Sequence, residues 1–209
     1  RIGKDTQIQS HVFIGNHVTI GKNCIIHSNV SIYDHTQIGD HVVIHAGTVI
    51  GSDAFYYKNR QTHHDQLLSS GFVKINNNVH IGALCTIDRG VSDVTLIDDD
   101  TKLDNQVHVG HDTQIGKRCI IASQVGIAGC TNVEDHVTLW GQVGITSGIT
   151  IGEKAVISAQ SGVSKSLEGH ASYFGTPAGE FRKKYKELAA IREIPKLKEQ
   201  LEKLEKSLQ

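Results

Sequence analysis

The chain has 209 residues, of which 38% are hydrophobic, and its 21 Lys and Arg residues nearly balance 22 Asp and Glu residues. This balance gives no general attraction to nucleic acid or to an anionic membrane surface, so neither is expected as a partner. No apolar run approaches the length that spans a bilayer, and no signal segment opens the sequence. We therefore expect a cytoplasmic protein without an integral membrane segment.

An aliphatic residue recurs at every sixth position from Ile2 to Ile50, then from Ile75 to Ile87, and again from Ile97 to Val163. A period of six fits neither an amphipathic helix nor the alternation of an ordinary strand. Each unit predicts a short strand and a corner, often with a glycine directly after the aliphatic residue, where a tight turn tolerates positive φ. Three units would form one coil of roughly 18 residues. The predicted fold is all-β, a parallel β-helix of about eight stacked coils over residues 1–166.

Two interruptions break these columns. The first is a polar loop, residues 52–74, which carries an aromatic cluster that begins at Phe55. The second is the stretch DRGVSD after Ile87, through which the register slips by four residues. Because long loops in a regular scaffold are more often functional than accidental, we expect the inserted loop to serve the function.

The hexapeptide pattern ends after Val163, and residues 167–209 predict a C-terminal extension with two helices. The first contains Phe181, Tyr185 and Leu188 at helical spacing, and Pro195 would either break the helix between the two segments or begin the second one. The second carries a heptad seam formed by Ile194, Leu197, Leu201, Leu204 and Leu208. A helix with only two heptads is marginally stable on its own. We therefore favour a small helical bundle that joins subunits over a helix that folds back on its own coil.

One of the thirteen histidines has a phase of its own in the repeat. His111 alone lies two residues after an aliphatic column position, within the stretch DNQVHVGHD that begins at Asp104. Histidine suits a general base near neutral pH. The glycine-rich corners that end at Gly129 and Gly144 would offer backbone N–H groups to a developing oxyanion. The residues alone leave open whether His111 is a catalytic base or an ordinary polar residue.

A metal site is another interpretation of the pair His108 and His111. Side chains three residues apart across a corner need not converge, and no third ligand recurs at the spacing of a coil, so we expect no metal. The four cysteines form no C-x-x-C pair. The small inward phase of the repeat holds Cys24, Cys85 and Cys119, whereas Cys130 lies at a corner. Free buried thiols in a reducing compartment are expected rather than disulfides or zinc ligands.

Four longer stretches closely resemble the UDP-3-O-acylglucosamine N-acyltransferase family of lipid A biosynthesis. They are IGALCTIDRG (81–90), KLDNQVHVGHD (102–112), QVGIAGCT (124–131) and YFGTPA (173–178). The resemblance covers most of residues 50–178. The combination of TIDRG with DNQ-x-x-x-x-H is far more specific than the hexapeptide repeat alone.

The resemblance implies a left-handed parallel β-helix that forms a homotrimer, with active sites in the grooves between subunits. It implies transfer of a 3-hydroxyacyl chain from acyl carrier protein to the 2-amine of a UDP-3-O-acylglucosamine, with His111 as the general base. The donor would bring its own phosphopantetheine arm, so no bound cofactor is expected. The predicted substrate-binding residues are Phe55, Asp104, Asn105, Gln106, His108, Gly129 and Gly144. The basic residues Arg182, Lys183 and Lys184 would either meet the acidic carrier protein or form a solvated helix face.

Departures from the family pattern leave other functions open. The family usually carries a uridine-binding domain before the coil, and this sequence opens inside the repeat. Ser147 and Gly148 stand where the family commonly has a second histidine, and DAFYY at 53–57 replaces D-G-F-G-F. One alternative is a paralogous acyltransferase or acetyltransferase that acts on another amino sugar with a coenzyme A donor. The other is a non-catalytic trimeric binding protein.

Overall fold

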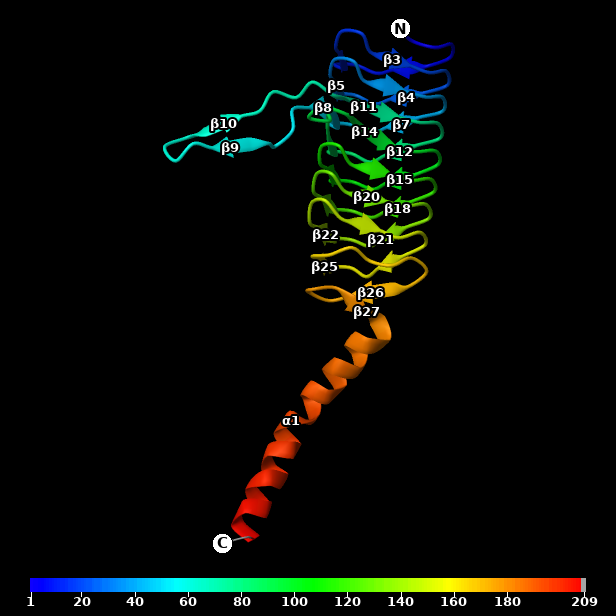
Figure 1. Ribbon diagram of the computed structural model, residues 1–209. Helices are drawn as coiled ribbons and strands as arrows, with labels where there is room; N and C mark the ends of the chain where they lie inside the picture. Colours follow the sequence, from blue (N-terminus) through cyan, green and yellow to red (C-terminus); the bar gives the residue numbers. More distant parts are fainter. Residues whose placement is uncertain (208–209) are drawn as a thin grey trace.

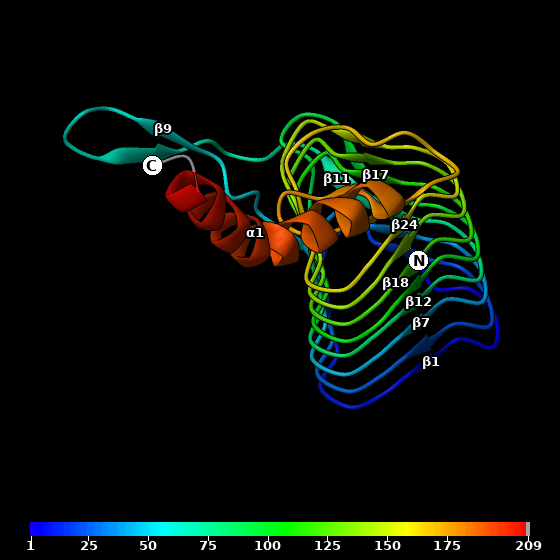
Figure 2. The same cartoon turned by 90° about the horizontal axis from the view of Figure 1, so that it is seen from below.

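A computed structural model describes residues 1–207 as a long coil with three flat sides. A hairpin projects from one corner of the coil, and a helix leaves its C-terminal end (Figures 1 and 2). Parallel hydrogen-bonded pairing joins each coil to the next, as between Gln7 and Ile25, which lie one coil apart. The fold is a left-handed parallel β-helix, as the resemblance implied.

The three sides are parallel sheets, called A, B and C here, in which the strands follow one another in chain order. Sheet A contains β3 (Thr19–Ile20), β6 (Gln37–Ile38), β11 (Phe72–Ile75), β14 (Val94–Ile97), β17 (Gln114–Ile115), β20 (Asn132–Val133) and β23 (Thr150–Ile151). Sheet B contains β1 (Gln7–Ile8), β4 (Ile25–Ile26), β7 (Val43–Ile44), β12 (His80–Ile81), β15 (Lys102–Leu103), β18 (Ile120–Ile121), β21 (Thr138–Leu139), β24 (Val156–Ile157), β26 (Ser172–Phe174) and the antiparallel β27 (Gly179–Glu180). Sheet C contains β2 (Phe13–Ile14), β5 (Ser31–Ile32), β8 (Val49–Ser52), β13 (Thr86–Asp88), β16 (His108–Val109), β19 (Gly126–Ile127), β22 (Gly144–Ile145) and β25 (Gly162–Val163).

The aliphatic columns fill the core, as predicted. Column side chains from Ile26 to Leu139 are buried, most of them fully, and each contributes roughly 1.5–3 kcal/mol of transfer free energy. The inward cysteines are buried free thiols, and Cys130 is an exposed free thiol at a corner. Buried threonines of the same phase donate to backbone carbonyls, as Thr48 Oγ1 does to Gly82 O at 2.7 Å.

Most glycines that follow the aliphatic residues have a different role from the one predicted; Gly51, at a φ of 86°, is at positive φ as expected. Gly21 is not at positive φ; instead, a Cβ there would lie 2.4 Å from the carbonyl oxygen of Gly39 on the next coil. Positive φ occurs three residues before the next aliphatic residue, at corner positions such as His17 and His35. Close approach of coils therefore selects the glycines, and the left-handed corner explains the recurrent polar residues.

Both interruptions of the repeat lie at the corner between sheets C and A. Residues 53–71 join β8 to β11 and form the projecting hairpin of β9 (Tyr57–Asn59) and β10 (His64–Gln66) (Figure 1). Residues 89–93 join β13 to β14 at the same corner of the following coil. His111 lies at this corner one coil further on, between β16 and β17.

The C-terminal region differs from the prediction in two ways. The coil continues beyond residue 166, because Leu167 pairs with Ile151 and Tyr173 with Ile157. These pairs are 16 residues apart, so a two-residue shortening of the coil concealed the repeat. The following segment is one helix, α1 (Phe181–Ser207), instead of two.

Helix α1 runs through Pro195. Proline removes one backbone hydrogen bond, but strong helix formers such as Ala, Leu, Glu and Lys surround it and keep the helix continuous. Leu208, the last residue of the predicted seam, lies outside the described residues. No helical segment of residues 1–207 combines the length and apolar character that a bilayer crossing requires.

Candidate active site

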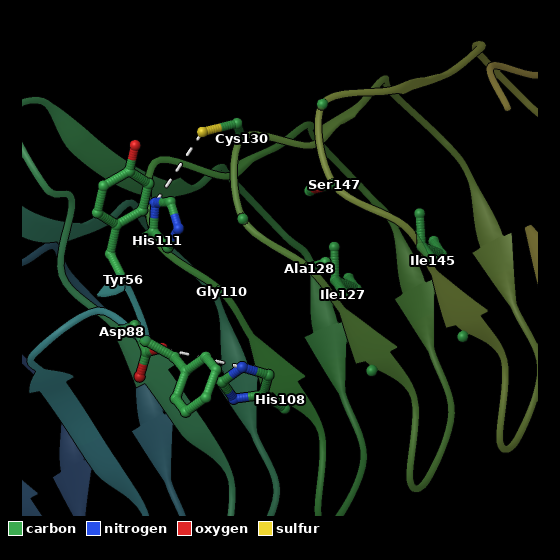
Figure 3. A pocket seen from close by; sticks show the side chains of 15 residues that line it. Tyr56, Asp88, His108, Gly110, His111, Ile127, Ala128, Cys130, Ile145 and Ser147 are labelled. Atoms are coloured by element: carbon green, nitrogen blue, oxygen red, sulfur yellow. Dashed lines mark hydrogen bonds and ion pairs between the residues drawn. The ribbon is translucent and has the colours of Figure 1, made fainter. Parts of the chain in front are cut away.

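A pocket of about 730 Å³ opens on sheet C beside its corner with sheet A (Figure 3). Two aromatic residues of the inserted loop form one wall, and successive coils form the rest. The lining residues are Phe55, Tyr56, Asp88, His108, Gly110, His111, Gly126, Ile127, Ala128, Gly129, Cys130, Gly144, Ile145, Ser147 and Gly148. The two interruptions and the histidine of unusual phase therefore meet in one place.

His111 is paired with the carboxylate of the next residue. Its Nδ1 lies 2.8 Å from Asp112 Oδ2, and only 14% and 17% of the two side chains are exposed. An ionised carboxylate only accepts hydrogen bonds, so this contact favours the tautomer with the proton on Nδ1 and a lone pair on Nε2. The ring of Tyr56 packs edge-to-face on the imidazole at 5.7 Å between centroids. The pair has the arrangement of an oriented general base.

The segment 89–93, which contains the four-residue register slip after Ile87, forms a cradle of backbone N–H groups around the Asp112 carboxylate. The Val91 N–H donates to Oδ2 at 3.0 Å and the Asp93 N–H donates to Oδ1 at 3.2 Å. Desolvation raises the pKa of Asp112, but these hydrogen bonds and the one from His111 outweigh it, so the pKa is lowered. Asp112 therefore stays ionised and holds the imidazole in place.

Gly129 provides the space beside the imidazole. A Cβ at this position would lie 2.5 Å from Nε2 of His111. The Gly129 N–H donates no hydrogen bond within residues 1–207. By contrast, the Gly144 N–H donates to Ser161 O at 3.0 Å within the sheet. Of the two corners predicted to offer oxyanion donors, the one at Gly129 therefore retains a free donor and the Gly144 N–H is already occupied.

A second acid and histidine pair, the buried Asp88 and the exposed His108, lines the same pocket. Asp88 is 6% exposed and accepts a hydrogen bond from Ser52 Oγ at 2.8 Å. Its other oxygen lies 3.8 Å from Nε2 of His108, whose Nδ1 is 2.8 Å from Thr86 Oγ1. Desolvation raises the pKa of Asp88 and outweighs the Ser52 hydrogen bond and the nearby histidines. A buried carboxylate with a raised pKa in a pocket is a typical functional-site signal.

A strip of glycines leads away from the two histidines along sheet C. The parallel register places Gly126, Gly144 and Gly162 in successive coils after His108. A Cβ at Gly126 or Gly144 would meet no atom within 4 Å, whereas one at Gly162 would lie 3.1 Å from Thr176 Cγ2. Packing within the described chain thus does not require the first two glycines. They leave an open trough that ends near Thr176.

The structure brings five of the predicted site residues to the pocket: Phe55, His108, His111, Gly129 and Gly144. Asp104, Asn105 and Gln106 lie at the other end of β16, at the corner between sheets B and C. There, Asn105 Oδ1 accepts from the Ala83 N–H at 2.8 Å, and Gln106 accepts from Gln124 at 2.9 Å. They do not line the pocket, so their contact with substrate stays a prediction.

The basic residues Arg182, Lys183 and Lys184 lie in the first turn of α1, beyond the end of the coil. Glu180 caps this turn by accepting from the backbone N–H groups of Arg182 and Lys183. Sequence reasoning did not single out Asp88, Asp112 or Cys130. Asp112 directly follows His111 and Asp88 lies in TIDRG, so both were visible in the motifs that carried the resemblance.

Comparisons with known proteins agree with this architecture. Residues 1–32, 17–52 and 95–129 match the family model described as bacterial transferase hexapeptide (six repeats). Residues 130–163 match the model described as hexapeptide repeat of succinyl-transferase. The solved UDP-N-acetylglucosamine acyltransferase of Bacteroides fragilis 9343 aligns with a TM-score of 0.79 and 26% identity, over 86% of this chain and 69% of that one. Fold and site thus define a protein of the hexapeptide-repeat acyltransferase class.

Two curated relatives identify the family within this class. The UDP-3-O-acylglucosamine N-acyltransferase of Chlamydia pneumoniae is 56% identical over 163 residues, which cover 78% of this chain and 45% of the relative. UDP-3-O-acylglucosamine N-acyltransferase 1 of Gloeobacter violaceus is 48% identical over 165 residues, or 79% and 47% of the two chains. The chain belongs to the UDP-3-O-acylglucosamine N-acyltransferase family, and it spans about half the length of the curated relatives it matches.

Proposed function

We propose that this protein is an N-acyltransferase that moves a 3-hydroxyacyl chain from acyl carrier protein to the 2-amine of a UDP-3-O-acylglucosamine in lipid A biosynthesis. The observation that carries the proposal is the His111–Asp112 pair at the edge of a pocket that continues into an open trough. The names of the relatives support the acceptor, a UDP-3-O-acylglucosamine, and the carrier-bound donor is part of the proposal.

In the proposed mechanism, Nε2 of His111 takes a proton from the amine as its nitrogen attacks the thioester carbonyl. Asp112 stabilises the imidazolium that forms, and the free N–H of Gly129 donates to the developing oxyanion. Collapse of the tetrahedral intermediate forms the amide and expels the thiolate of the phosphopantetheine arm, which takes up the proton from His111. The protein needs no bound cofactor for this chemistry.

The glycine trough supports an acyl chain as the occupant. It has no side chains of its own at Gly126 and Gly144, and Ile127, Ala128 and Ile145 contribute to the lining of the same pocket. Three steps between stacked coils, from His108 to Gly162, span about 14 Å. A long, narrow, largely apolar trough suits a linear hydrocarbon better than a second sugar.

The exposed apolar surfaces support a homotrimer. Phe55 and Leu68 on the inserted loop are 84% and 82% exposed, and an isolated two-stranded hairpin is marginal in water. Along α1, apolar side chains such as Ile191, Leu197 and Leu201 are more than half exposed. Neighbouring subunits would cover both surfaces and bring Asp104 and its neighbours to the pocket. The basic start of α1 would receive the acidic carrier protein, and the proposed location of the reaction is the cytoplasm.

The experiment is an N-acyl transfer assay with the purified protein, 3-hydroxyacyl carrier protein and UDP-3-O-acylglucosamine, with the product identified by mass spectrometry. Coenzyme A thioesters and other UDP-amino sugars are supplied in parallel. The proposal expects the amide product from the carrier-bound donor. Turnover only with coenzyme A and another amino sugar would favour the paralogue. Binding of the carrier protein without any turnover would favour the non-catalytic alternative.

A further inference from the structure

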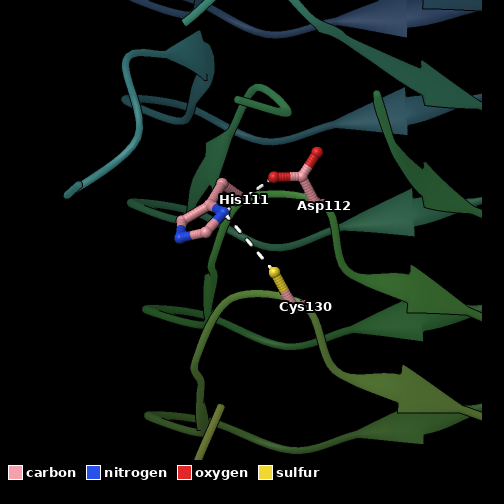
Figure 4. Close-up of side chains that lie close together, drawn as sticks. All are labelled: His111, Asp112 and Cys130. Carbon is pink, nitrogen blue, oxygen red and sulfur yellow. Dashed lines mark hydrogen bonds and ion pairs between the residues drawn. The ribbon is translucent and has the colours of Figure 1, made fainter. Parts of the chain in front are cut away.

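We propose that His111, Asp112 and Cys130 form a zinc site and that zinc bound there switches the general base off. Each of the three residues offers one potential ligand atom, and these three atoms all lie within 4.8 Å of one another (Figure 4). Among residues 1–207, no other group of three His, Cys, Asp or Glu residues meets this condition. Nδ1 of His111 is 2.8 Å from Asp112 Oδ2 and 4.0 Å from Cys130 Sγ. Imidazole nitrogen, thiolate sulfur and carboxylate oxygen are the common protein ligands of zinc.

The distances between the potential ligands are close to those of an occupied site. Zinc bonds of about 2.0–2.3 Å in a tetrahedron place neighbouring ligand atoms about 3.3–3.6 Å apart. The His111–Asp112 contact must therefore open by roughly half an ångström and the Cys130 contact must close by a similar amount. Cys130 is exposed, so its thiol is free to adjust.

The repeat itself preorganises the three residues. Asp112 and Cys130 occupy the same left-handed corner position, at φ of 55° and 58°, in two successive coils. The Cys130 N–H donates to the His111 carbonyl at 2.8 Å, and the cradle after Ile87 fixes the carboxylate. His108, which the sequence suggested as a partner for His111 in a metal site, is engaged by Thr86 instead. Three protein ligands leave a fourth position open for water.

Zinc at this position would remove the base without blocking the whole pocket. The metal displaces one proton from the Cys130 thiol, so zinc, thiolate and carboxylate sum to zero charge. It also takes the lone pair of Nδ1, which sends the imidazole proton to Nε2. Nε2 then has no lone pair for the proton of the amine. Inhibition rests on the proposed acyl transfer, whereas zinc binding does not.

The test titrates the purified protein with Co²⁺, whose bond to a thiolate gives a near-ultraviolet charge-transfer band, and then displaces it with Zn²⁺. Wild type is expected to bind one ion with this band. Cys130→Ser should lose the band and bind zinc at least about tenfold more weakly, given that even outer-shell changes cost 10–100-fold. The matched control is His108→Gln, which changes a neighbouring histidine and should keep the band.

The outcomes separate binding from inhibition. A missing band in wild type, or a band that persists in Cys130→Ser, would overturn the site. If the band forms as expected, one equivalent of zinc should suppress acyl transfer by the wild type, and a chelator should restore it. Zinc-insensitive transfer by the zinc-loaded protein would overturn the inhibitory role. Should the protein show no acyl transfer at all, the titration still decides whether the metal site exists.

Discussion

The space that Gly129 leaves beside His111 gives the sharpest prediction from the site geometry. In Gly129→Ala, the new Cβ would lie 2.5 Å from Nε2 and 2.7 Å from two ring carbons of His111. Ordinary contacts between such atoms are about 3.5 Å, so the ring must move by about 1 Å. A misplacement of this size costs about 100-fold in rate, which equals about 2.7 kcal/mol of transition-state stabilisation.

The assay compares kcat/KM for acyl transfer by the wild type, Gly129→Ala and Gly126→Ala. Gly126 lines the same pocket, but a Cβ there meets no atom within 4 Å. Neither glycine is at positive φ, so backbone strain does not separate the two variants. We expect the large loss in Gly129→Ala and a much smaller change in Gly126→Ala. Wild-type kcat/KM in Gly129→Ala would refute the position assigned to the base.

Three further predictions concern the trough, the buried carboxylate and the helix. Gly144→Leu should change the thermal midpoint little, because a Cβ there meets no atom within 4 Å and the longer side chain can extend into the open trough, yet the longest acyl donors should be lost from the chain-length profile. The pKa of Asp88 is raised in the folded state by desolvation, so its contribution favours folding at low pH and is lost as pH rises through the folded pKa. Asp88→Asn should therefore have a larger free energy of unfolding than wild type in denaturant at pH 7. The gain should be smaller below the unfolded pKa of about 3.9. A variant less stable than wild type at pH 7 would contradict the predicted direction. Leu197→Asp, at an exposed apolar position of α1, should shift the proposed trimer toward smaller species in sedimentation velocity. A sedimentation coefficient equal to that of the wild type would count against the helical bundle.

Much of the fold could be predicted because the repeat is strict. An unbroken period of six from Ile2 to Ile50 leaves few architectures that bury the column. The prediction failed where the period changed: the 16-residue spacing from Ile151 to Leu167 hid the last coil. It failed again at Pro195, where local propensity suggested a break and the helix absorbs one lost hydrogen bond.

The candidate site could be located in part for a similar reason. The unique phase of His111 was visible in the sequence, because each corner of a regular coil occupies a fixed position in the six-residue repeat. Its partner was not assigned, because the cradle for Asp112 is built by the backbone of residues 89–93, one coil earlier. The spacing of Cys130 from His111 equals one coil plus one residue, a relation that gains meaning only once the coils are stacked. Asp104 lies at the other end of β16 from the pocket, so its predicted contact with substrate rests on the proposed trimer.

His111 is the proposed base on which the mechanism depends most directly, so the deciding measurement is the rate of N-acyl transfer by wild type and His111→Ala at equal protein concentration. Positioned proton transfer contributes about 10²- to 10⁴-fold, so a loss in this range is predicted, with the trimer intact by sedimentation. An intact His111→Ala trimer that transfers the acyl chain within about tenfold of the wild-type rate would contradict the account.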